Sequence, residues 1–326
     1  MENSKYTAHE ERYANSELYQ RCGESGILLP KISLGLWHNF GGNDSYERGR
    51  NIIRYAFDNG ITHFDLANNY GPPYGSAEEN FGRMINEDFR PYRDEMFIST
   101  KAGYDMWPGP YGNWGSRKYM IASLDQSLKR MNLEYVDLFY SHRYDPNTPL
   151  EETLQALVDI VHAGKSLYVG ISRWPLHALH FANQYLRERD VPLLIYQGRL
   201  NMLDTAPTEE GILDYCQENG IGFISFSPLA QGLLTDKYLQ GIPDGSRMTH
   251  SKHLKSDILT PELLEKIGRL NSIAKEQNMT LPQMALRWIL EQKGVTSVLV
   301  GASSVEQLRE NVFSVRSEQL GVRSEQ

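Results

Sequence analysis

The segment Ile61-Thr62-His63-Phe64-Asp65 is a short apolar run that ends on a carboxylate, and the chain repeats this arrangement twice. Residues 96–101 (MFISTK) end on an amine and residues 136–142 (VDLFYSH) end on an imidazole, while a tyrosine lies in the loop after the first run. Each run has the composition of a β-strand, and strands that end on one rim of a barrel bring distant side chains together. The pattern therefore predicts one pocket that holds Asp65, Tyr70, Lys101 and His142.

These four side chains suit the protonation of a carbonyl oxygen. A phenol titrates near pH ~10 in water, and a neighbouring ammonium group stabilises the phenolate and lowers that pKa. We therefore expect Lys101 to lower the pKa of Tyr70, and Asp65 to keep the lysine charged and fixed. His142 supplies a hydrogen bond that can orient a substrate carbonyl. The four side chains hold no hydride source, so the group implies a cofactor.

Strand-like runs alternate with helical patterns along nearly the whole chain, which is typical of parallel βαβ units. The length of 326 residues fits one α/β barrel or two smaller domains, but no long linker divides the pattern. We therefore predict a single (β/α)8 TIM barrel domain over residues 1–326, because eight strands close a barrel of this type. The expected strands are 32–37, 61–65, 96–101, 136–142, 167–172, 193–197, 222–227 and 295–301.

Helical patterns fill the intervals between these strands. In the stretch 117–131 the apolar residues recur at helical spacing, and Ser116 is placed to cap its start. Residues 19–22 and 27–30 predict a small hairpin at the bottom of the barrel, and 240–257 predicts a long mobile loop near the active face. The expected helices are 46–59, 77–86, 117–131, 150–163, 176–189, 209–219, 261–277, 282–291 and 304–312.

Composition argues against several classes of function, although local basic pockets for a phosphorylated ligand stay open. A formal charge of −8 argues against nonspecific nucleic-acid binding, which depends on basic patches. No apolar run approaches the ~20 residues that a spanning helix needs, and the polar start is unlike a signal peptide, so we expect a cytoplasmic protein without a membrane partner. Two cysteines, Cys22 and Cys216, are too few for a cysteine metal site, and the nine histidines show no paired ligand spacing, so we predict no metal. A homo-oligomer remains open.

Three motifs resemble those of the aldo-keto reductase superfamily over roughly residues 19–312. They are residues 60–71 (GITHFDLANNYG) with the aspartate and tyrosine, residues 99–101 (STK) with the lysine, and residues 141–143 (SHR) with the histidine. Residues 33–41, 71–78 and 101–112 look more narrowly like the bacterial L-glyceraldehyde 3-phosphate reductases. The chain also resembles the β subunits of voltage-gated potassium channels.

The resemblance implies NADPH as the cofactor and a small carbonyl compound as the substrate. It makes Tyr70 the general acid, Lys101 and Asp65 the pair that tunes it, and His142 the group that orients the carbonyl. Trp37, Tyr70 and His142 would contact the substrate. The implied cofactor contacts are Trp37, Asp65, Ser172, Arg173, Gln197, Phe226, Ser227, Pro228, Leu229, Ala230, Gly232, Lys237, Arg247, Gly301, Ser303, Gln307, Glu310 and Asn311.

Within this set, Ser172, Arg173 and Gln197 would lie near the nicotinamide amide, with Phe226 stacked on its ring. The segment 227–232 and Lys237 would hold the pyrophosphate. Arg247 and the residues from Gly301 onward would hold the adenosine end, where cations and a helix N-terminus suit a 2′-phosphate. Arg173 and Phe226 depart from the asparagine and tyrosine that are common elsewhere in the superfamily.

Other interpretations remain. Asp65 and Lys101 could form only a structural ion pair, and Trp37 and Phe226 could be plain core aromatics. The chain could be a regulatory subunit that binds NADPH and docks on a membrane protein, although the channel subunits carry asparagine where this chain has His142. A barrel enzyme without redox chemistry, such as an isomerase, is a third alternative. His63, inside a strand, is expected to be structural.

Overall fold

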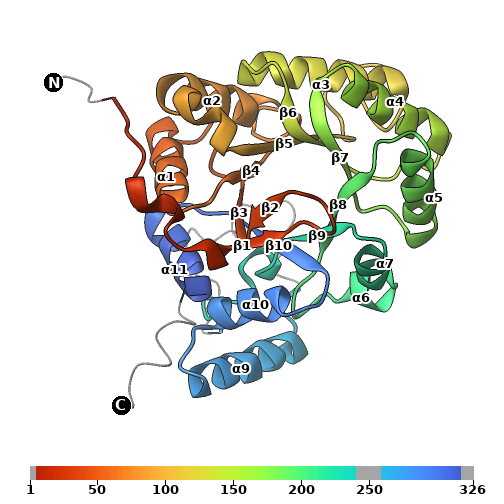
Figure 1. Ribbon diagram of the computed structural model, residues 1–326. Helices are drawn as coiled ribbons and strands as arrows, with labels where there is room; N and C mark the ends of the chain where they lie inside the picture. The colour runs from red at the N-terminus through yellow and green to blue at the C-terminus, as the bar shows by residue number, and fades with distance from the viewer. Residues whose placement is uncertain (1–4, 240–257, 317–326) are drawn as a thin grey trace.

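Eight parallel strands close into a barrel with helices around it, as the sequence predicts (Figure 1). The computed structural model describes residues 5–239 and 258–316. Around the ring the strands follow the order β10-β3-β4-β5-β6-β7-β8-β9, and every neighbouring pair is parallel. The barrel strands are β3 (Ile32–Gly35), β4 (His63–Asp65), β5 (Phe97–Ala102), β6 (Val136–Ser141), β7 (Ser166–Ser172), β8 (Leu193–Arg199), β9 (Gly222–Phe226) and β10 (Val295–Val300).

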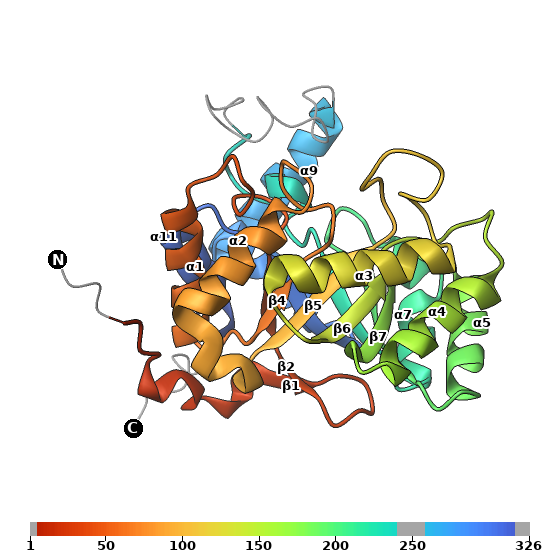
Figure 2. The same ribbon diagram turned by 90° about the horizontal axis from the view of Figure 1, so that it is seen from above.

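The helices connect successive strands and cover the outside of the barrel (Figures 1 and 2). They are α1 (Tyr46–Asp58), α2 (Ser76–Met84), α3 (Arg117–Met131), α4 (Leu150–His162), α5 (Leu176–Arg187), α6 (Ala206–Glu209), α7 (Ile212–Glu218), α9 (Pro261–Glu276), α10 (Leu281–Leu290) and α11 (Val305–Arg316). Short helical segments are η1 (Glu10–Tyr13), η2 (Ser16–Leu18), η3 (Ile85–Phe89), η4 (Arg90–Glu95) and η5 (Ala230–Gly232). Among the described residues, none of these helices combines the length and the apolar character that crossing a membrane requires.

Most helix boundaries fall within a few residues of their predicted positions because local signals set them. The Ser116 hydroxyl accepts a hydrogen bond from Tyr119 N and caps α3, as predicted. The predicted helix over 209–219 is wrong at its start, because Gly211 adopts a left-handed φ of 75° and separates α6 from α7. The turns η3 and η4, which follow α2, were not predicted.

The predicted hairpin is present and closes the lower end of the barrel (Figure 2). It pairs β1 (Tyr19–Arg21) with β2 (Leu28–Pro30) in antiparallel register. Cys22 and Leu29 are fully buried among interior side chains of the barrel, including Leu138 and Ile224. The hairpin therefore supplies part of the core, and the pocket can form only at the opposite rim, where the strands end.

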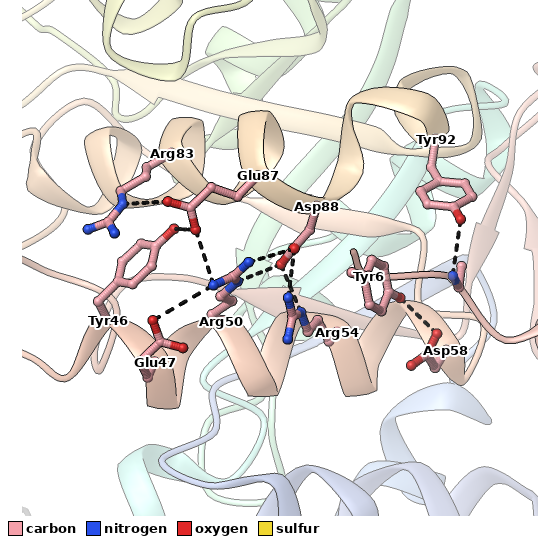
Figure 3. Close-up of polar contacts among 11 residues, drawn as sticks. Tyr6, Tyr46, Glu47, Arg50, Arg54, Asp58, Arg83, Glu87, Asp88 and Tyr92 are labelled. Atoms are coloured by element: carbon pink, nitrogen blue, oxygen red, sulfur yellow. Dashed lines mark hydrogen bonds and ion pairs between the residues drawn. The ribbon is translucent and has the colours of Figure 1, made fainter. Parts of the chain in front are cut away.

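The N-terminal segment is attached to the outside of the barrel by polar contacts (Figure 3). The Tyr6 hydroxyl donates to Asp58 Oδ1 at 2.7 Å, and Ala8 N donates to the Tyr92 hydroxyl oxygen at 3.1 Å. Beside them, Asp88 accepts paired hydrogen bonds from Arg50 and Arg54 at 2.7 to 2.8 Å. These contacts join α1 to the η3–η4 segment. The expected loop at 240–257 lies outside the described residues.

Candidate active site

Asp65 and Lys101 form a buried ion pair at the ends of β4 and β5. Lys101 Nζ donates to Asp65 Oδ2 and, at 2.7 Å, to the backbone oxygen of Leu66. The Asp65 side chain is 2% exposed and the Lys101 side chain is 0% exposed. Parallel pairing of β4 with β5 puts their ends side by side, which is why residues far apart in the sequence meet here.

Tyr70 and His142 lie next to this pair, so the structure brings the four predicted residues together. Lys101 Nζ is 5.0 Å from the centre of the Tyr70 ring, and the rings of Tyr70 and His142 are 6.0 Å apart, edge to face. Trp37 forms a further wall, with its ring 6.3 Å from that of Tyr70. The backbone of His142 is held by its N–H, which donates to Ala102 O at 2.8 Å. A phenol, an imidazole and an indole grouped in this way are suited to contact a small carbonyl compound.

The protonation states of these groups differ from the sequence prediction in one respect. Burial raises the pKa of the Tyr70 phenol well above its usual value, and the negative charge of Asp65 raises it further. The predicted lowering of the Tyr70 pKa is therefore wrong for the net shift, because burial and the charge of Asp65 determine its direction. Burial lowers the pKa of Lys101, while the charge of Asp65 opposes that shift. A phenol with a raised pKa keeps its proton at neutral pH, which is the form that a donor needs.

His142 is neutral at physiological pH. Burial lowers the pKa of its imidazole well below the usual value, and the positive charges of Lys101, Arg173 and Arg143 lower it further. Its Nδ1 atom is buried and has no hydrogen-bond partner among the described residues. A neutral imidazole beside Tyr70 can donate one hydrogen bond to a substrate oxygen.

A chain of hydrogen bonds runs through the barrel interior and ends on Asp65. Ser99 Oγ donates to Asp65 Oδ1 at 2.6 Å and lies 2.9 Å from His63 Nε2. His63 Nδ1 lies 2.9 Å from Ser33 Oγ, which is 2.7 Å from Ser297 Oγ. Ser297 Oγ in turn donates to Pro30 O, the last residue of the hairpin, at 2.6 Å. His63 is therefore structural, as predicted, and it also connects the barrel base to the carboxylate.

The two ends of this chain make conflicting demands on His63. If Ser297 donates to Pro30 O, Ser33 must donate to Ser297 and can only accept from His63 Nδ1. If Ser99 donates to Asp65, it can only accept from His63 Nε2. Both ring nitrogens would then have to donate, which only the imidazolium form can do. Burial lowers the pKa of His63 to about 4, so the ring is neutral at pH 7. A neutral ring carries one N–H, so one of the contacts in the chain has no proton to share. The tautomer of His63 determines whether that contact is on the Asp65 side or on the hairpin side of the ring.

The residues expected near a nicotinamide amide lie beside this site, at the ends of β7 and β8. Gln197 Nε2 donates to Asp65 Oδ1 at 3.4 Å, and the Ser172 hydroxyl donates to Gln197 O at 3.0 Å. Arg173 has a left-handed φ of 58° and an exposed side chain, with its N–H donating to Gln197 O. Phe226 is the last residue of β9 and is half-buried.

The segment expected to hold a pyrophosphate is an irregular turn directly after β9. Positive φ angles at Ser227, Ala230, Gln231 and Gly232 turn the chain sharply, with Pro228 and Leu229 between them. Backbone N–H groups exposed by such turns are suited to binding anions. Lys237 follows on the surface. Asn201, which the sequence analysis missed, anchors the turn by donating to Ser227 O at 3.1 Å.

The residues expected at the adenosine end follow β10, the strand next to β9. Gly301 and Ser303 are exposed, and Ser303 N donates to Gln307 Oε1 at 2.8 Å, which closes the first turn of α11. Glu310 is exposed and Asn311 is buried on the same helix. The candidate cofactor residues thus follow neighbouring strand ends from β7 to β10. Arg247 lies outside the described residues.

One aromatic residue and one cationic residue near His142, Tyr104 and Arg143, were not among the predicted site residues. The Tyr104 ring packs edge-on against His142 with centres 4.8 Å apart, and the Arg143 guanidinium carbon lies 4.3 Å from the centre of the Tyr104 ring. Both follow directly on strand ends that the analysis had identified. The available signals were their positions after strand ends and within the motifs at 101–112 and 141–143.

Comparison with known proteins relates the chain to one family and to two kinds of relative. Residues 31–321 match the Aldo/keto reductase family. The chain is 58% identical to the L-glyceraldehyde 3-phosphate reductases of Escherichia coli K12 and of E. coli O157:H7, over 96% of this chain and 91% of each relative. It is 35% identical to a probable voltage-gated potassium channel subunit beta of Arabidopsis thaliana, over 91% of this chain and 90% of that protein.

Proposed function

Because the chain belongs to the aldo/keto reductase family, we propose that it uses NADPH to reduce small or phosphorylated aldehydes, of the glyceraldehyde 3-phosphate or methylglyoxal type, to alcohols. The observation that carries this proposal is the grouping of a protonated phenol and a neutral imidazole around the Lys101–Asp65 pair. The relative at 58% identity is named as a reductase of such a substrate.

In this reaction the side chains act on the carbonyl oxygen. His142 donates a hydrogen bond that orients the oxygen, and Tyr70 transfers its proton to it. The Lys101 ammonium, whose Nζ lies 5.0 Å from the centre of the ring, then stabilises the resulting phenolate. A bound NADPH would supply the hydride that completes the reduction.

The donor set fits such a cofactor. Gln197 offers a side-chain amide to a carboxamide, Phe226 offers an aromatic face, and the positive-φ turn at 227–232 offers backbone N–H groups to phosphates. Ser303 and Gln307 stand at the start of α11, where the helix dipole favours an anion. The order of these elements around the rim matches an extended dinucleotide that runs from β7 to β10.

The channel-subunit alternative is less well supported. Identity to the channel relative is 35%, against 58% for the reductases, and His142 completes a proton-transfer site that a purely regulatory protein does not need.

The direct test is stopped-flow oxidation of NADPH against a panel of aldehydes, with nicotinamide fluorescence as a measure of binding. We expect NADPH to bind and to be oxidised with glyceraldehyde, its 3-phosphate or methylglyoxal. Binding without oxidation by any aldehyde would favour the regulatory alternative. No change in nicotinamide fluorescence would favour an enzyme without redox chemistry.

A further inference from the structure

An open groove of about 710 Å³ is lined by Tyr104, which packs against His142, and shares Arg173 and Phe226 with the candidate nicotinamide site; its remaining residues have no role in the proton transfer described above. Its walls combine aromatic rings with guanidinium groups, including Tyr104, Trp114, Arg143, Arg173 and Phe226. Cationic groups beside apolar surfaces at a rim are a common arrangement for binding a small anion.

Arg143 is held rigidly in this groove. Its Nε donates to Gly103 O and its Nη2 donates to Asn113 Oδ1, each at 2.6 Å. Its guanidinium carbon lies over two rings, 4.3 Å from the centre of Tyr104 and 3.5 Å from that of Trp114. Of the five N–H donors of an arginine, these bonds use two, so Arg143 can still bind an anion without first ordering its side chain.

The groove carries cationic charge that its own carboxylates do not compensate. Of the three arginines that line it, Arg199 forms an ion pair with Asp204, whereas Arg143 and Arg173 form none with any carboxylate of the described residues. Glu210 is the other acidic residue of the lining. Arg143 and Arg173 are also close enough to His142 to lower the pKa of its imidazole, so both lie near the substrate end of the groove.

We propose that this groove binds the phosphate monoester of the aldehyde substrate, with Arg143 as its principal ligand and the Tyr104 hydroxyl as a second donor. The proposal rests on the proposed function, since it places the aldehyde between Tyr70 and His142. Tyr104 Oη accepts a hydrogen bond from Arg173 Nη1 at 3.0 Å and keeps its own proton to donate. Arginine suits phosphate because its planar fork can bond two oxygens at once.

The spacing agrees with a three-carbon substrate. Four bonds separate the carbonyl carbon of glyceraldehyde 3-phosphate from its phosphorus, a span of about 5 Å when extended. The Tyr104 ring is close to both groups, with its centre 4.8 Å from that of His142 and 4.3 Å from the Arg143 guanidinium carbon. An aldehyde oxygen bonded to His142 therefore leaves the phosphate alongside Tyr104 and within reach of Arg143.

The test compares kcat/KM for glyceraldehyde 3-phosphate with kcat/KM for glyceraldehyde, in the full-length enzyme with NADPH. We expect the parent to prefer the phosphorylated substrate and Arg143→Met to lower that ratio by about 10- to 100-fold, the effect of losing a charged hydrogen bond. Arg143→Lys should keep part of the preference. Inorganic phosphate should inhibit glyceraldehyde reduction by the parent competitively, and about tenfold less strongly in Arg143→Met.

The control is Arg199→Gln, which changes a groove arginine that is already paired with Asp204 and should leave the ratio unchanged. Equal kcat/KM values for the two substrates in the parent, or a parental ratio in Arg143→Met, would overturn the phosphate site and leave the reductase function intact. A parent that reduces no aldehyde would instead overturn the proposed function. A parent that prefers succinic semialdehyde to glyceraldehyde 3-phosphate would assign the groove to carboxylates.

Discussion

Tyr70 occupies a position in which three neighbours limit what its hydroxyl can do. Lys101 lies 5.0 Å from its ring centre, His142 meets its ring edge to face, and Trp37 bounds it on a third side. Its raised pKa keeps it protonated at neutral pH. It can therefore release a proton only when an acceptor such as a carbonyl oxygen develops negative charge, and then with Lys101 available to stabilise the phenolate.

The first prediction concerns this hydroxyl. Tyr70→Phe removes the proton donor and leaves the ring, so kcat for aldehyde reduction should fall by about 10² to 10⁴-fold while NADPH affinity stays near that of the parent. Steady-state kinetics and nicotinamide fluorescence measure the two effects. Tyr74→Phe is the control, because that phenol lies in the same loop but is 59% exposed. Turnover of Tyr70→Phe at the parental rate would contradict the assigned mechanism.

The second prediction concerns Ser99, which links His63 to Asp65. Ser99→Ala removes a hydrogen bond to a charged carboxylate, so kcat should fall about tenfold with little change in KM, and stability should fall by about 1–3 kcal/mol. Ser225→Ala is the matched control, since that buried hydroxyl donates only to Leu200 O. It should lose stability and keep kcat. Equal kcat values for the two variants would mean that the chain ending on Asp65 has no influence on catalysis.

At the scale of elements, Asp88 joins η3 to α1 through Arg50 and Arg54 (Figure 3). Burial raises the pKa of Asp88, but the hydrogen bonds and charges of the two arginines outweigh it and lower that pKa overall. A carboxyl with a lowered pKa contributes stability that is present above its unfolded value, ~3.9, and is lost as the pH falls through the folded value.

The third prediction follows from the lowered pKa of Asp88. Asp88→Asn should reduce the free energy of unfolding at pH 7 by about 2–4 kcal/mol, because it removes the carboxylate that both arginines bond and leaves Arg50 only its ion pairs with Glu47 and Glu87. The difference from the parent should shrink as the pH falls below ~4. Chemical denaturation at pH 7 and pH 3 measures both values. Glu47→Gln, which removes a 67% exposed partner of Arg50, should change stability by less than about 0.5 kcal/mol. A pH-independent deficit would contradict this account.

The fourth prediction uses two glycines of opposite character. Gly211 separates α6 from α7 with φ 75°, and a Cβ there would meet only Leu176 at 3.7 Å, so Gly211→Ala should cost about 1 kcal/mol through backbone conformation alone. Gly268 lies within α9 and its Cβ position is open, so Gly268→Ala should stabilise by about 0.5–1 kcal/mol. Thermal unfolding of both variants measures the two effects, and the melting temperature should fall for Gly211→Ala and rise for Gly268→Ala. Melting temperatures that change in the same direction would contradict this account.

At the scale of the whole molecule, the hairpin near the N-terminus completes a core formed by strands from the rest of the chain. Leu29 is fully buried in the barrel interior, whereas its neighbour Leu28 is 55% exposed. Leu29→Ala should therefore lower the free energy of unfolding by about 2–5 kcal/mol, and Leu28→Ala by less than about 1 kcal/mol. Denaturant titration of the two variants is the measurement. Similar losses would mean that the hairpin does not contribute to the core.

The barrel itself was predictable because its signals are local. Apolar runs of strand length alternate with amphipathic helices, and each boundary depends on nearby groups such as the Ser116 cap or the prolines at the starts of α9 and α10. The four candidate catalytic residues were predictable for the same reason, since each lies at or just after a strand end, and parallel strands of a barrel end on one rim.

Tertiary structure alone decided how these groups affect one another. The direction of the Tyr70 pKa shift depends on burial and on the charge of the neighbouring Asp65, which a sequence does not express. The hydrogen-bond chain from Pro30 to Asp65 and the contacts of Arg143 with the Tyr104 and Trp114 rings join residues from separate elements. Periodicity and caps act over a few residues and are written in order along the chain, whereas electrostatic fields and hydrogen-bond chains depend on distances that exist only after the barrel has closed.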